Sequence, residues 1–600
     1  MKSAAGSRDN SQKLGDFTTT ARVLPISVLA ILIGAIATYV AWALLRLIGL
    51  FTNLFYYGRW NTSFVSPANN HLGWFAVLVP VAGGLIVGLM ARYGSERIRG
   101  HGIPEALESI LLNGSKVQPR LAILKPVSAA IAIGSGGPFG AEGPIIMTGG
   151  AFGSVISQLF RLSAAERKTL LVAGAAAGMS ATFAAPVAAV LLAVELMLYE
   201  WKPRSAIPVA LASATAGAMR RYVLGLGPIF PVPQHALYIG PGGLMGCLVV
   251  GLLAGCLSAL LTLGVYGTED LFSKLPIHWM WWPAIGGVAV GLGGLIFPQA
   301  LGVGYDTIGR LLQGDVPRTV IAGVLLVKSA IWVISLGSGT SGGVLAPLLM
   351  MGAALGGVES AFLPHQGAGF WQLVSMGAIL GGTMHVPFTA VLFAFELTHD
   401  TSVLLPLLVA AMLAHLTTVL LLKRSILTEK VARRGFHITC EYSIDPLEIL
   451  FAREVMRTNV AALPADAAIE DLRQTFFRES TGRGQHLFPV IDGERRVTGV
   501  VTRKELRELM ESQDSRRSLG KALRKPVVAY SDEPLRAVVM RMAETGFTRM
   551  PVIEAGGQLA GMISLRDLLM ARVRSFNEER HRERVLRLRL PFRQRAEMKD

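Results

Sequence analysis

The chain has 600 residues, of which 52% are hydrophobic and only 16% are charged. This composition excludes a single soluble domain, because apolar stretches of this extent need a membrane to cover them. The net charge of +16 does not indicate a nucleic-acid partner, because membrane proteins collect Lys and Arg in cytoplasmic loops and tails.

The first predicted element is a polar N-terminal segment, residues 1–21, which lacks the pattern of a cleaved signal peptide. Apolar runs long enough to cross a bilayer follow from about residue 22 to 422, and charged residues become dense after residue 436. Lys and Arg are concentrated before the first run and after the second, which predicts a cytoplasmic N-terminus. We therefore expect a membrane domain over residues 22–436.

Two glycine-rich stretches inside this domain match each other. The first is Gly134-Ser-Gly-Gly-Pro-Phe-Gly140-Ala-Glu142-Gly-Pro144, and the second is Gly337-Ser-Gly-Thr-Ser-Gly-Gly343-Val-Leu-Ala-Pro347. Glycines 134, 136 and 140 align with 337, 339 and 343, and the final prolines align as well, all at an offset of 203 (347 − 144). Each stretch leads into an apolar helix, so backbone N–H groups and the positive helix end point at whatever lies in front. Two such ends would hold an anion without a fixed positive charge.

A second repeat follows in the same order. The stretch Pro186–Leu196 matches Pro387–Leu397 at an offset of 201 (387 − 186). Two repeats at nearly equal offsets predict a duplicated membrane domain, with halves over about 22–222 and 240–436. Such duplications commonly give inverted halves and broken helices that meet at the substrate site.

The C-terminal part also repeats. Phe488-Pro-Val-Ile491 and the residues after it match Met550-Pro-Val-Ile553 at an offset of 62 (551 − 489). Each copy reads as two strands around a turn, followed by a helix that begins after Thr502 or Ser564. We predict one α/β domain over residues 450–511, a second over 520–573, and a basic tail over 574–600.

Four landmarks now stand in order along the chain. They are Gly100-His-Gly-Ile-Pro104, Gly140-Ala-Glu-Gly-Pro144, Gly343-Val-Leu-Ala-Pro347 and the C-terminal repeat. Together they resemble the CLC family of chloride channels and anion/proton antiporters, and the repeat resembles a tandem pair of CBS domains. The resemblance implies an all-α polytopic membrane domain with an inverted internal repeat and broken helices, followed by an α/β tandem CBS domain. It also implies a homodimer in the lipid bilayer.

The resemblance implies an anion site where several helix N-termini converge. The implied anion-binding residues are Gly100, His101, Gly102, Ile103, Gly140, Ala141, Gly143, Gly343, Val344, Leu345, Ala346 and Leu427. Glu142 resembles the family's gating glutamate, whose carboxylate competes with the anion for the same N–H groups. The alternative is a first-turn glutamate that only complements its own helix dipole.

Three positions depart from the family pattern. His101 stands where the family usually has Ser, Leu345 where it has Phe, and Leu427 where it has Tyr. His101 is either an N–H donor to the anion or a helix-end residue that faces the cytoplasm. Chloride is the expected anion, and nitrate, bromide or another small anion remains open.

The inner proton position of the family's antiporters aligns with Leu196, and Glu195 lies beside it. Successive helical residues point about 100° apart, so Glu195 does not face the same way. We therefore expect a channel-like pore. An anion/proton antiporter with another inner proton route is the alternative, and a membrane-anchored nucleotide sensor or a cation transporter is a further one.

No cofactor or metal is required by this interpretation, and no constellation for covalent chemistry predicts an enzyme. The CBS resemblance implies an adenine nucleotide as a possible ligand, held by two pairs: Thr502 with Glu505, and Ser564 with Asp567. Helix capping demands the same residue types at the same spacing, so it remains the alternative. We expect a bacterial inner membrane, with both termini in the cytoplasm.

Overall fold

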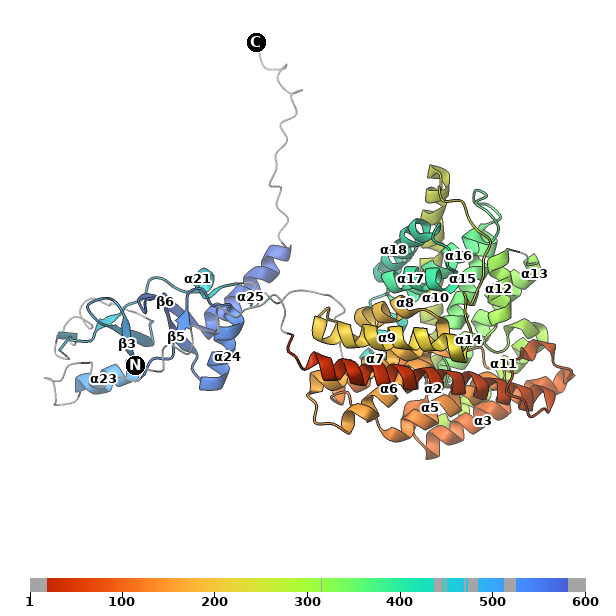
Figure 1. Cartoon of the computed structure of the whole chain (residues 1–600), viewed down its shortest axis with the longest axis horizontal. Coiled ribbons are helices and arrows are strands. Elements are labelled where there is room, and N and C mark those ends of the chain that lie inside the picture. Colours follow the sequence, from red (N-terminus) through yellow and green to blue (C-terminus); the bar gives the residue numbers. More distant parts are fainter. Residues whose placement is uncertain are drawn as a thin grey trace, which may run out of the picture. The chain divides into compact units, whose positions relative to one another are not determined.

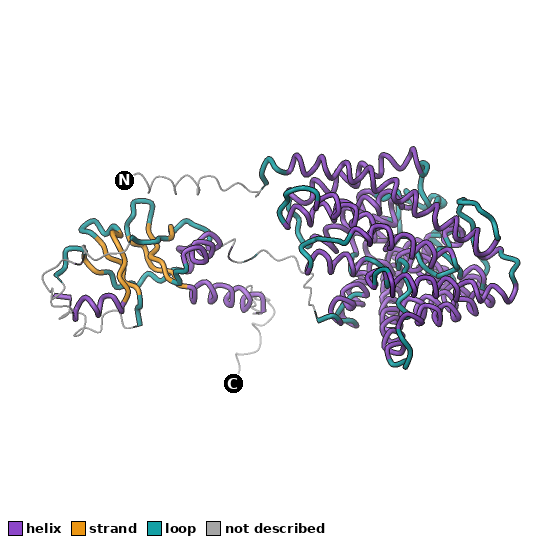
Figure 2. Tube along the Cα trace, turned by 90° about the horizontal axis from the view of Figure 1, so that it is seen from below, coloured by secondary structure: helices purple, strands orange, loops and turns teal. Residues whose placement is uncertain are grey.

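The computed structural model describes residues 19–314, 316–435, 445, 447, 450–468, 471–472, 484–511, 519 and 525–580. It divides into two compact units, one within residues 15–441 and the other within residues 442–600. The first unit is built from helices, and the second combines helices with short strands (Figure 2). The predicted N-terminal segment up to residue 18 and the predicted basic tail from residue 581 lie outside the described residues.

The helical unit opens with the first repeat. Its α-helices are α2 (Val23–Tyr57), α3 (Leu78–Tyr93), α4 (Ile103–Leu112), α5 (Pro119–Gly134), α6 (Glu142–Gln158), α7 (Ala164–Phe183), α8 (Pro186–Leu192) and α9 (Pro203–Val223). Short helical turns add η1 (Pro67–Asn69), η2 (Gly73–Val77), η3 (Glu96–Ile98) and a π-helical extension of α8, η4 (Ala193–Leu198).

The second repeat follows the same plan. Its α-helices are α10 (Pro241–Ser273), α11 (Trp282–Ile296), α12 (Tyr305–Gln313), α13 (Arg318–Gly323), α14 (Ser329–Gly337), α15 (Leu345–Glu359), α16 (Phe370–Met384), α17 (Pro387–Thr398), α18 (Leu404–Leu421) and α19 (Ile426–Arg433). Its short elements are η5 (Trp279–Trp281), η6 (Pro298–Ala300) and the π-helical η7 (Val324–Lys328), which joins α13 to α14.

The described helices include six that are long and apolar enough to cross a membrane. Others are too short to cross alone, among them α15 and α17. Broken helices of this kind leave backbone groups free at membrane depth, where protein or a watery cavity must satisfy them. The predicted all-α membrane domain with interrupted helices is confirmed.

Small residues let the long helices approach closely. In Figure 1, α2 (red) runs beside α9 (yellow), and a Cβ atom added at Gly34 of α2 would lie 2.5 Å from the Ala212 carbonyl oxygen of α9. The α6–α7 contact is equally tight, since a Cβ at Gly149 would lie 2.3 Å from the Gly174 carbonyl oxygen. Close backbone packing of this kind is how helices associate in lipid, where the hydrophobic effect does not drive association.

Two sets of contacts relate the repeats by a two-fold axis. Gly140 and Gly343 are equivalent by the offset of 203 (343 − 140), and they pair with each other as an isolated antiparallel bridge. Glu396 of the second repeat accepts hydrogen bonds from the first N–H groups of α8, and Glu195 of the first repeat accepts them at Thr389 of α17. Reciprocal contacts between equivalent residues are the mark of a two-fold relation, which agrees with the predicted inversion.

The C-terminal unit contains two small sheets with the same topology. The first has β1 (Leu463–Pro464), β2 (Leu487–Ile491) and β3 (Val497–Thr502), and the second has β4 (Ala529–Tyr530), β5 (Arg549–Ile553) and β6 (Leu559–Ser564). In each, the first strand pairs in parallel with the second, and the second pairs antiparallel with the third. The described helices are α21 (Ala452–Val455), α23 (Arg503–Glu511), α24 (Leu535–Thr545) and α25 (Leu565–Arg580).

The two hairpins of this unit are joined through their turns. The Val497 N–H donates to the Gly557 carbonyl at 3.1 Å, and the Leu559 N–H donates to the Arg495 carbonyl at 3.0 Å. The predicted duplication of the C-terminal part is therefore present as two equivalent α/β lobes in direct contact.

Candidate functional site

The three glycine motifs of the membrane unit meet at one place. The Gly140 N–H donates to the Gly343 carbonyl at 3.1 Å, and the Gly343 N–H donates to the Gly140 carbonyl at 2.9 Å. The Gly342 N–H donates to the Gly100 carbonyl at 3.4 Å. Loops that lie up to 243 residues apart in sequence (343 − 100) are thus bonded to one another through their backbones.

Glycine is needed here because these backbones leave no room for a side chain. A Cβ atom at Gly143 would lie 1.8 Å from the His101 carbonyl oxygen, and one at Gly102 would lie 2.5 Å from the Gly143 carbonyl oxygen. Gly102 also has a φ of +90°, which favours glycine over any other residue. The repeated glycines therefore serve close approach as well as turn geometry.

Three helices begin at this junction. They are α4 at Ile103, α6 at Glu142 and α15 at Leu345, and neither α6 nor α15 has a side-chain cap on its own first turn. The first turns of these helices therefore present backbone N–H groups without intrahelical partners, together with the positive helix end. This is the arrangement that binds an anion.

Glu142 already occupies one of these helix ends. Its side chain is fully buried, and its Oε1 accepts a hydrogen bond from the Ala346 N–H of α15 at 3.1 Å. Its Oε2 is buried and has no hydrogen-bond partner in the described structure. A Cβ atom added at Gly343 would lie 2.6 Å from this oxygen. The Glu142 carboxylate thus binds the N-terminus of α15, a helix of the other repeat.

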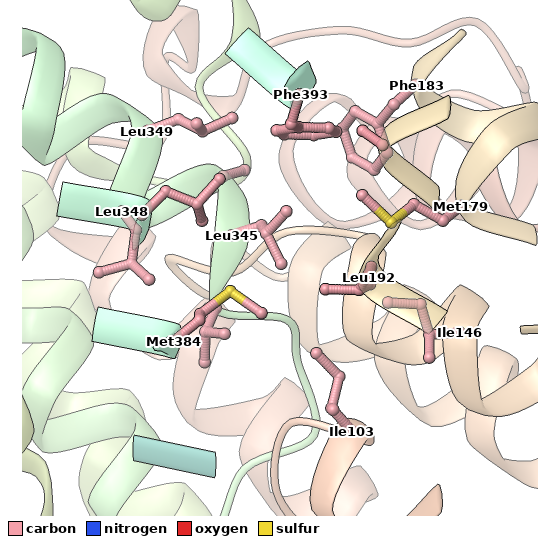
Figure 3. Close-up of a cluster of buried hydrophobic side chains, with 14 of the residues drawn as sticks. Ile103, Ile146, Met179, Phe183, Leu192, Leu345, Leu348, Leu349, Met384 and Phe393 are labelled. Atoms are coloured by element: carbon pink, nitrogen blue, oxygen red, sulfur yellow. The ribbon is translucent and has the colours of Figure 1, made fainter. Parts of the chain in front are cut away.

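Apolar side chains from both repeats surround this end of α15. Figure 3 shows Leu345 among Ile103, Leu192 and Met384, with Phe183 and Phe393 close by. All six are buried in one hydrophobic cluster. Electrostatic interactions strengthen where water is excluded, so hydrogen bonds and helix ends count for more here than at a surface.

His101 lies between the junction and a pocket that it helps to line, which we call the His101 pocket. The His101 side chain is buried, and its Nδ1 has no hydrogen-bond partner in the described structure. Five charged residues also line the pocket: Glu96, Arg99, Glu269, Lys430 and Arg434. Three of these are basic and two are acidic, so the pocket carries a net positive charge that favours anions.

Leu427 is buried in α19, which packs against α4. The neighbouring Ile426 carbonyl accepts a 2.5 Å hydrogen bond from the Tyr266 hydroxyl of α10. Tyr266 also lines the His101 pocket. Sequence reasoning missed this tyrosine, because it lies on another helix about 160 residues away (426 − 266), and no motif marks it.

Two buried lysines were also missed. The Lys125 ammonium donates to the carbonyls of Ile98 and Gly100 at 2.8 and 2.7 Å, and the Lys328 ammonium donates to those of Ala300 and Gly302 at 2.8 and 2.6 Å. Both side chains are fully buried, and they are equivalent by the offset of 203 (328 − 125). A lysine in an apolar helix is by itself a signal of function, and this signal could have found them.

Leu196, which the sequence aligns with the inner proton position of the family's antiporters, is a buried apolar residue. Glu195 beside it accepts hydrogen bonds from the Thr389 N–H and hydroxyl at 3.0 and 2.6 Å. Glu396 accepts from the Val187 and Ala188 N–H groups at 2.9 and 2.8 Å. Each glutamate therefore caps a helix of the other repeat.

Both candidate nucleotide pairs in the C-terminal unit act as helix caps. Glu505 accepts from the Thr502 N–H and hydroxyl, and Asp567 accepts from the Ser564 N–H and hydroxyl. Asp567 also forms an ion pair with Arg457 at 2.8 Å. Capping thus accounts for these residues, whether or not the pairs also meet a nucleotide.

Known proteins share this organisation. A family model described as voltage gated chloride channel matches residues 83–419, and a CBS domain model matches residues 452–512 and 520–574. A putative chloride channel protein ClcB-like from Ralstonia nicotianae is 30% identical over 356 residues, which cover 57% of this chain and 82% of that protein. An H(+)/Cl(-) exchange transporter ClcA from Citrobacter koseri is 30% identical over 373 residues, covering 57% and 76%.

Solved structures show the same fold. A slow cyanobacterial Cl−/H+ antiporter superimposes with a TM-score of 0.59 at 21% identity, covering 70% of this chain and 99% of the other. A eukaryotic CLC transporter gives a TM-score of 0.57 at 20% identity, covering 91% and 98%.

Proposed function

The chain belongs to the voltage gated chloride channel family and is an anion-transporting membrane protein rather than an enzyme, and we propose that it carries chloride through a pore gated by Glu142 without tight proton coupling. The proposed gating role of Glu142 rests on the hydrogen bond that its carboxylate accepts from the Ala346 N–H. An anion and this carboxylate compete for the same donor, so the pore conducts when the carboxylate leaves.

Backbone groups supply the anion site in this proposal. The candidate ligands are the N–H groups at the starts of α4, α6 and α15, since Leu345 and Leu427 offer no polar side-chain atom. The partial charges of these N–H groups suit a conduction site. Their hydrogen bonds compensate the anion for its lost water, yet they hold it weakly enough for it to leave. The buried His101 side chain adds an N–H donor at the pocket from which the ion enters.

The lack of tight proton coupling rests on Leu196, Glu195 and Glu396. An apolar Leu196 cannot carry a proton, and both glutamates hold helix N-termini of the opposite repeat. The alternative is an anion/proton antiporter with another inner proton route. Relatives named H(+)/Cl(-) exchange transporters favour this alternative.

The gate is tested by the substitution Glu142→Gln in chloride efflux from liposomes. Protonation removes the carboxylate charge and weakens its hold on the α15 N-terminus, so wild-type efflux rises as the pH falls. Gln keeps the shape without the titrating charge, so its efflux stays equally fast at pH 4.5 and 7.5. Efflux of the variant that keeps the wild-type pH dependence would disprove the gating role.

We also propose a homodimer in a bacterial inner membrane, with cytoplasmic termini and regulation through the CBS pair. The apolar side chains exposed on α17 and α18 support a lipid or subunit contact there, among them Phe388 at 54% and Leu405 at 58% exposure. The mass of the detergent-purified protein by light scattering tests the dimer. An adenine nucleotide is the proposed ligand of the CBS pair.

A further inference from the structure

An acidic residue, Glu359, ends α15, the helix whose first turn binds the Glu142 carboxylate. The Glu359 side chain is fully buried, and neither of its carboxyl oxygens has a hydrogen-bond partner in the described structure. Glu142, Glu195 and Glu396 differ in this respect, because each accepts at least one hydrogen bond from a backbone N–H group. An ionisable side chain that lies inside a membrane domain without a partner indicates a functional site.

The helices around this end of α15 bring no opposite charge to Glu359. The helix that packs most closely on α15 is α16, which contains no ionisable residue. The Ser375 hydroxyl of α16 lies close to the Glu359 carboxyl, and it too is buried without a hydrogen-bond partner in the described structure. No charged side chain in the described part of the chain interacts electrostatically with Glu359. The neighbouring α10, α12, α13 and η7 do carry ionisable residues, among them Cys247, Tyr305, Asp306, Arg310, Arg318 and Lys328.

The first repeat shows that the fold does not need an acid at this place. Glu359 aligns with Ile156 of α6 at the offset of 203 (359 − 156) that also relates the glycine motifs. The two helix contacts are built alike, since a Cβ atom added at Gly356 or Gly153 would lie 2.3 or 2.2 Å from a backbone carbonyl oxygen of α16 or α7. An apolar side chain fits the equivalent place in α6, so packing does not account for the acid in α15.

An ionised Glu359 would be unfavourable for two reasons. An unpaired charge is costly to bury, so a group in this position takes up a proton and becomes neutral. The carboxylate would also stand at the C-terminal end of α15, which is the negative end of the helix dipole. A bound proton removes the charge and makes the carboxyl a hydrogen-bond donor, for which the Ser375 oxygen is an acceptor. The neutral acid is therefore the form that fits this site.

We propose that Glu359 is a proton-binding site at the end of α15, which is occupied in the active protein and emptied in alkaline solution. Loss of the proton leaves a charge that is unstable in the contact between α15 and α16, so the side chain turns outward, where the neighbouring Val358 and Ser360 are exposed. This movement loosens α15, whose other end carries the Ala346 N–H that binds the Glu142 carboxylate. Anion transport consequently slows as the pH rises.

Infrared spectroscopy of the purified full chain tests the proton site directly, because a protonated carboxyl absorbs apart from carboxylates and amides. Every sample carries Glu142→Gln, which removes the other fully buried acid at α15. At pH 7.5 we expect a protonated-carboxyl band that is lost when Glu359→Gln is added and shifted when Ser375→Ala is added. The band also disappears reversibly when the pH is raised to about 9.5, since a buried carboxyl loses its proton only in alkaline solution.

Glu396→Gln is the matched control for the spectra. It removes a buried glutamate of the same repeat, whose two oxygens accept backbone N–H hydrogen bonds and which therefore keeps its charge. The band stays in place in this variant. A band that survives Glu359→Gln unchanged, or one that is lost with Glu396→Gln instead, would disprove the proton site at Glu359.

Chloride efflux from liposomes buffered alike on both sides tests the effect on transport, which rests on the proposed function. In the Glu142→Gln background, we expect efflux to fall about fivefold between pH 7.5 and about pH 9.5, and we expect the added Glu359→Gln to abolish this fall. An equal fall with and without Glu359→Gln would disprove the regulation. A chain that carries no chloride at any pH would overturn the proposed function, while the infrared spectra would still decide whether Glu359 holds a proton.

Discussion

At the scale of single residues, Glu142 depends on two glycines that face it. Its carboxylate packs against Gly140 and Gly343, where an added Cβ would lie 1.7 and 2.6 Å from its Oε2. A methyl group at either place would push the carboxylate off the Ala346 N–H. The proposed gate and these glycines therefore form one packed unit, to which Gly343 is contributed by the second repeat.

We expect Gly343→Ala to abolish chloride efflux, because the new methyl would lie 2.6 Å from the Gly140 carbonyl oxygen and fill the space between the two loops. An anion then cannot reach the N–H donor that the displaced Glu142 carboxylate frees. Gly267→Ala is the matched control, since a Cβ at this glycine of α10 meets nothing within 4 Å. Both variants are purified and assayed in liposomes. Normal efflux from Gly343→Ala, at the rate of Gly267→Ala, would show that the two loops do not confine the anion path.

Residues differ in how far the sequence could predict their place. The glycine motifs and Glu142 stand out because their spacing recurs across the repeat, and the structure brings those loops together as expected. Tyr266 has no such mark, because the hydrogen bond that its hydroxyl donates to the Ile426 carbonyl depends on a neighbour that only the fold supplies. The importance of Lys125 and Lys328 could have been predicted from the sequence, because a charged side chain in an apolar helix needs a partner.

At the scale of elements, the repeats are held together by helix caps exchanged between them. Glu396 binds the start of α8, and Glu195 binds the start of α17. Both helices begin with a proline, which needs no N–H partner at that position. The match of Pro186–Leu196 with Pro387–Leu397 marks these glutamates as equivalent, but it could not predict that each caps the other's helix.

We expect Glu396→Gln and Glu195→Gln each to destabilise the protein by about 1 kcal/mol, because a charged cap is replaced by a neutral one. Thermal unfolding in detergent, followed by tryptophan fluorescence, measures the loss. Chloride efflux from liposomes stays near the wild-type rate in both variants. A variant with unchanged thermal stability and altered proton movement would instead identify its glutamate as a proton carrier.

At the scale of the whole molecule, the C-terminal unit contains an acidic side chain, Asp567, that is a candidate nucleotide ligand. This side chain already has partners within the protein. Asp567 caps Ser564 and pairs with Arg457, whose side chain is 57% exposed. The Arg457 side of this ion pair is open to solvent, so a nucleotide can displace the arginine at modest cost.

We expect Arg457→Ala to tighten ATP binding to the full chain about twofold to fivefold, since Asp567 no longer has to leave its partner. Asp567→Asn abolishes the binding, and titration calorimetry of the detergent-purified protein measures both. The control is Arg496→Ala, which removes an arginine paired with Glu494 on the first hairpin. If Asp567→Asn binds ATP with the wild-type affinity, Asp567 serves only as a helix cap and not as a nucleotide ligand.

The question that decides how this protein works is whether protons accompany the anion. Purified protein in liposomes is placed under a chloride gradient, and chloride and proton movement are recorded together. Leu196 and the capped glutamates predict chloride flux with no linked proton movement. Uphill proton movement driven by the chloride gradient would contradict this and establish an antiporter with an inner proton route that does not use Leu196.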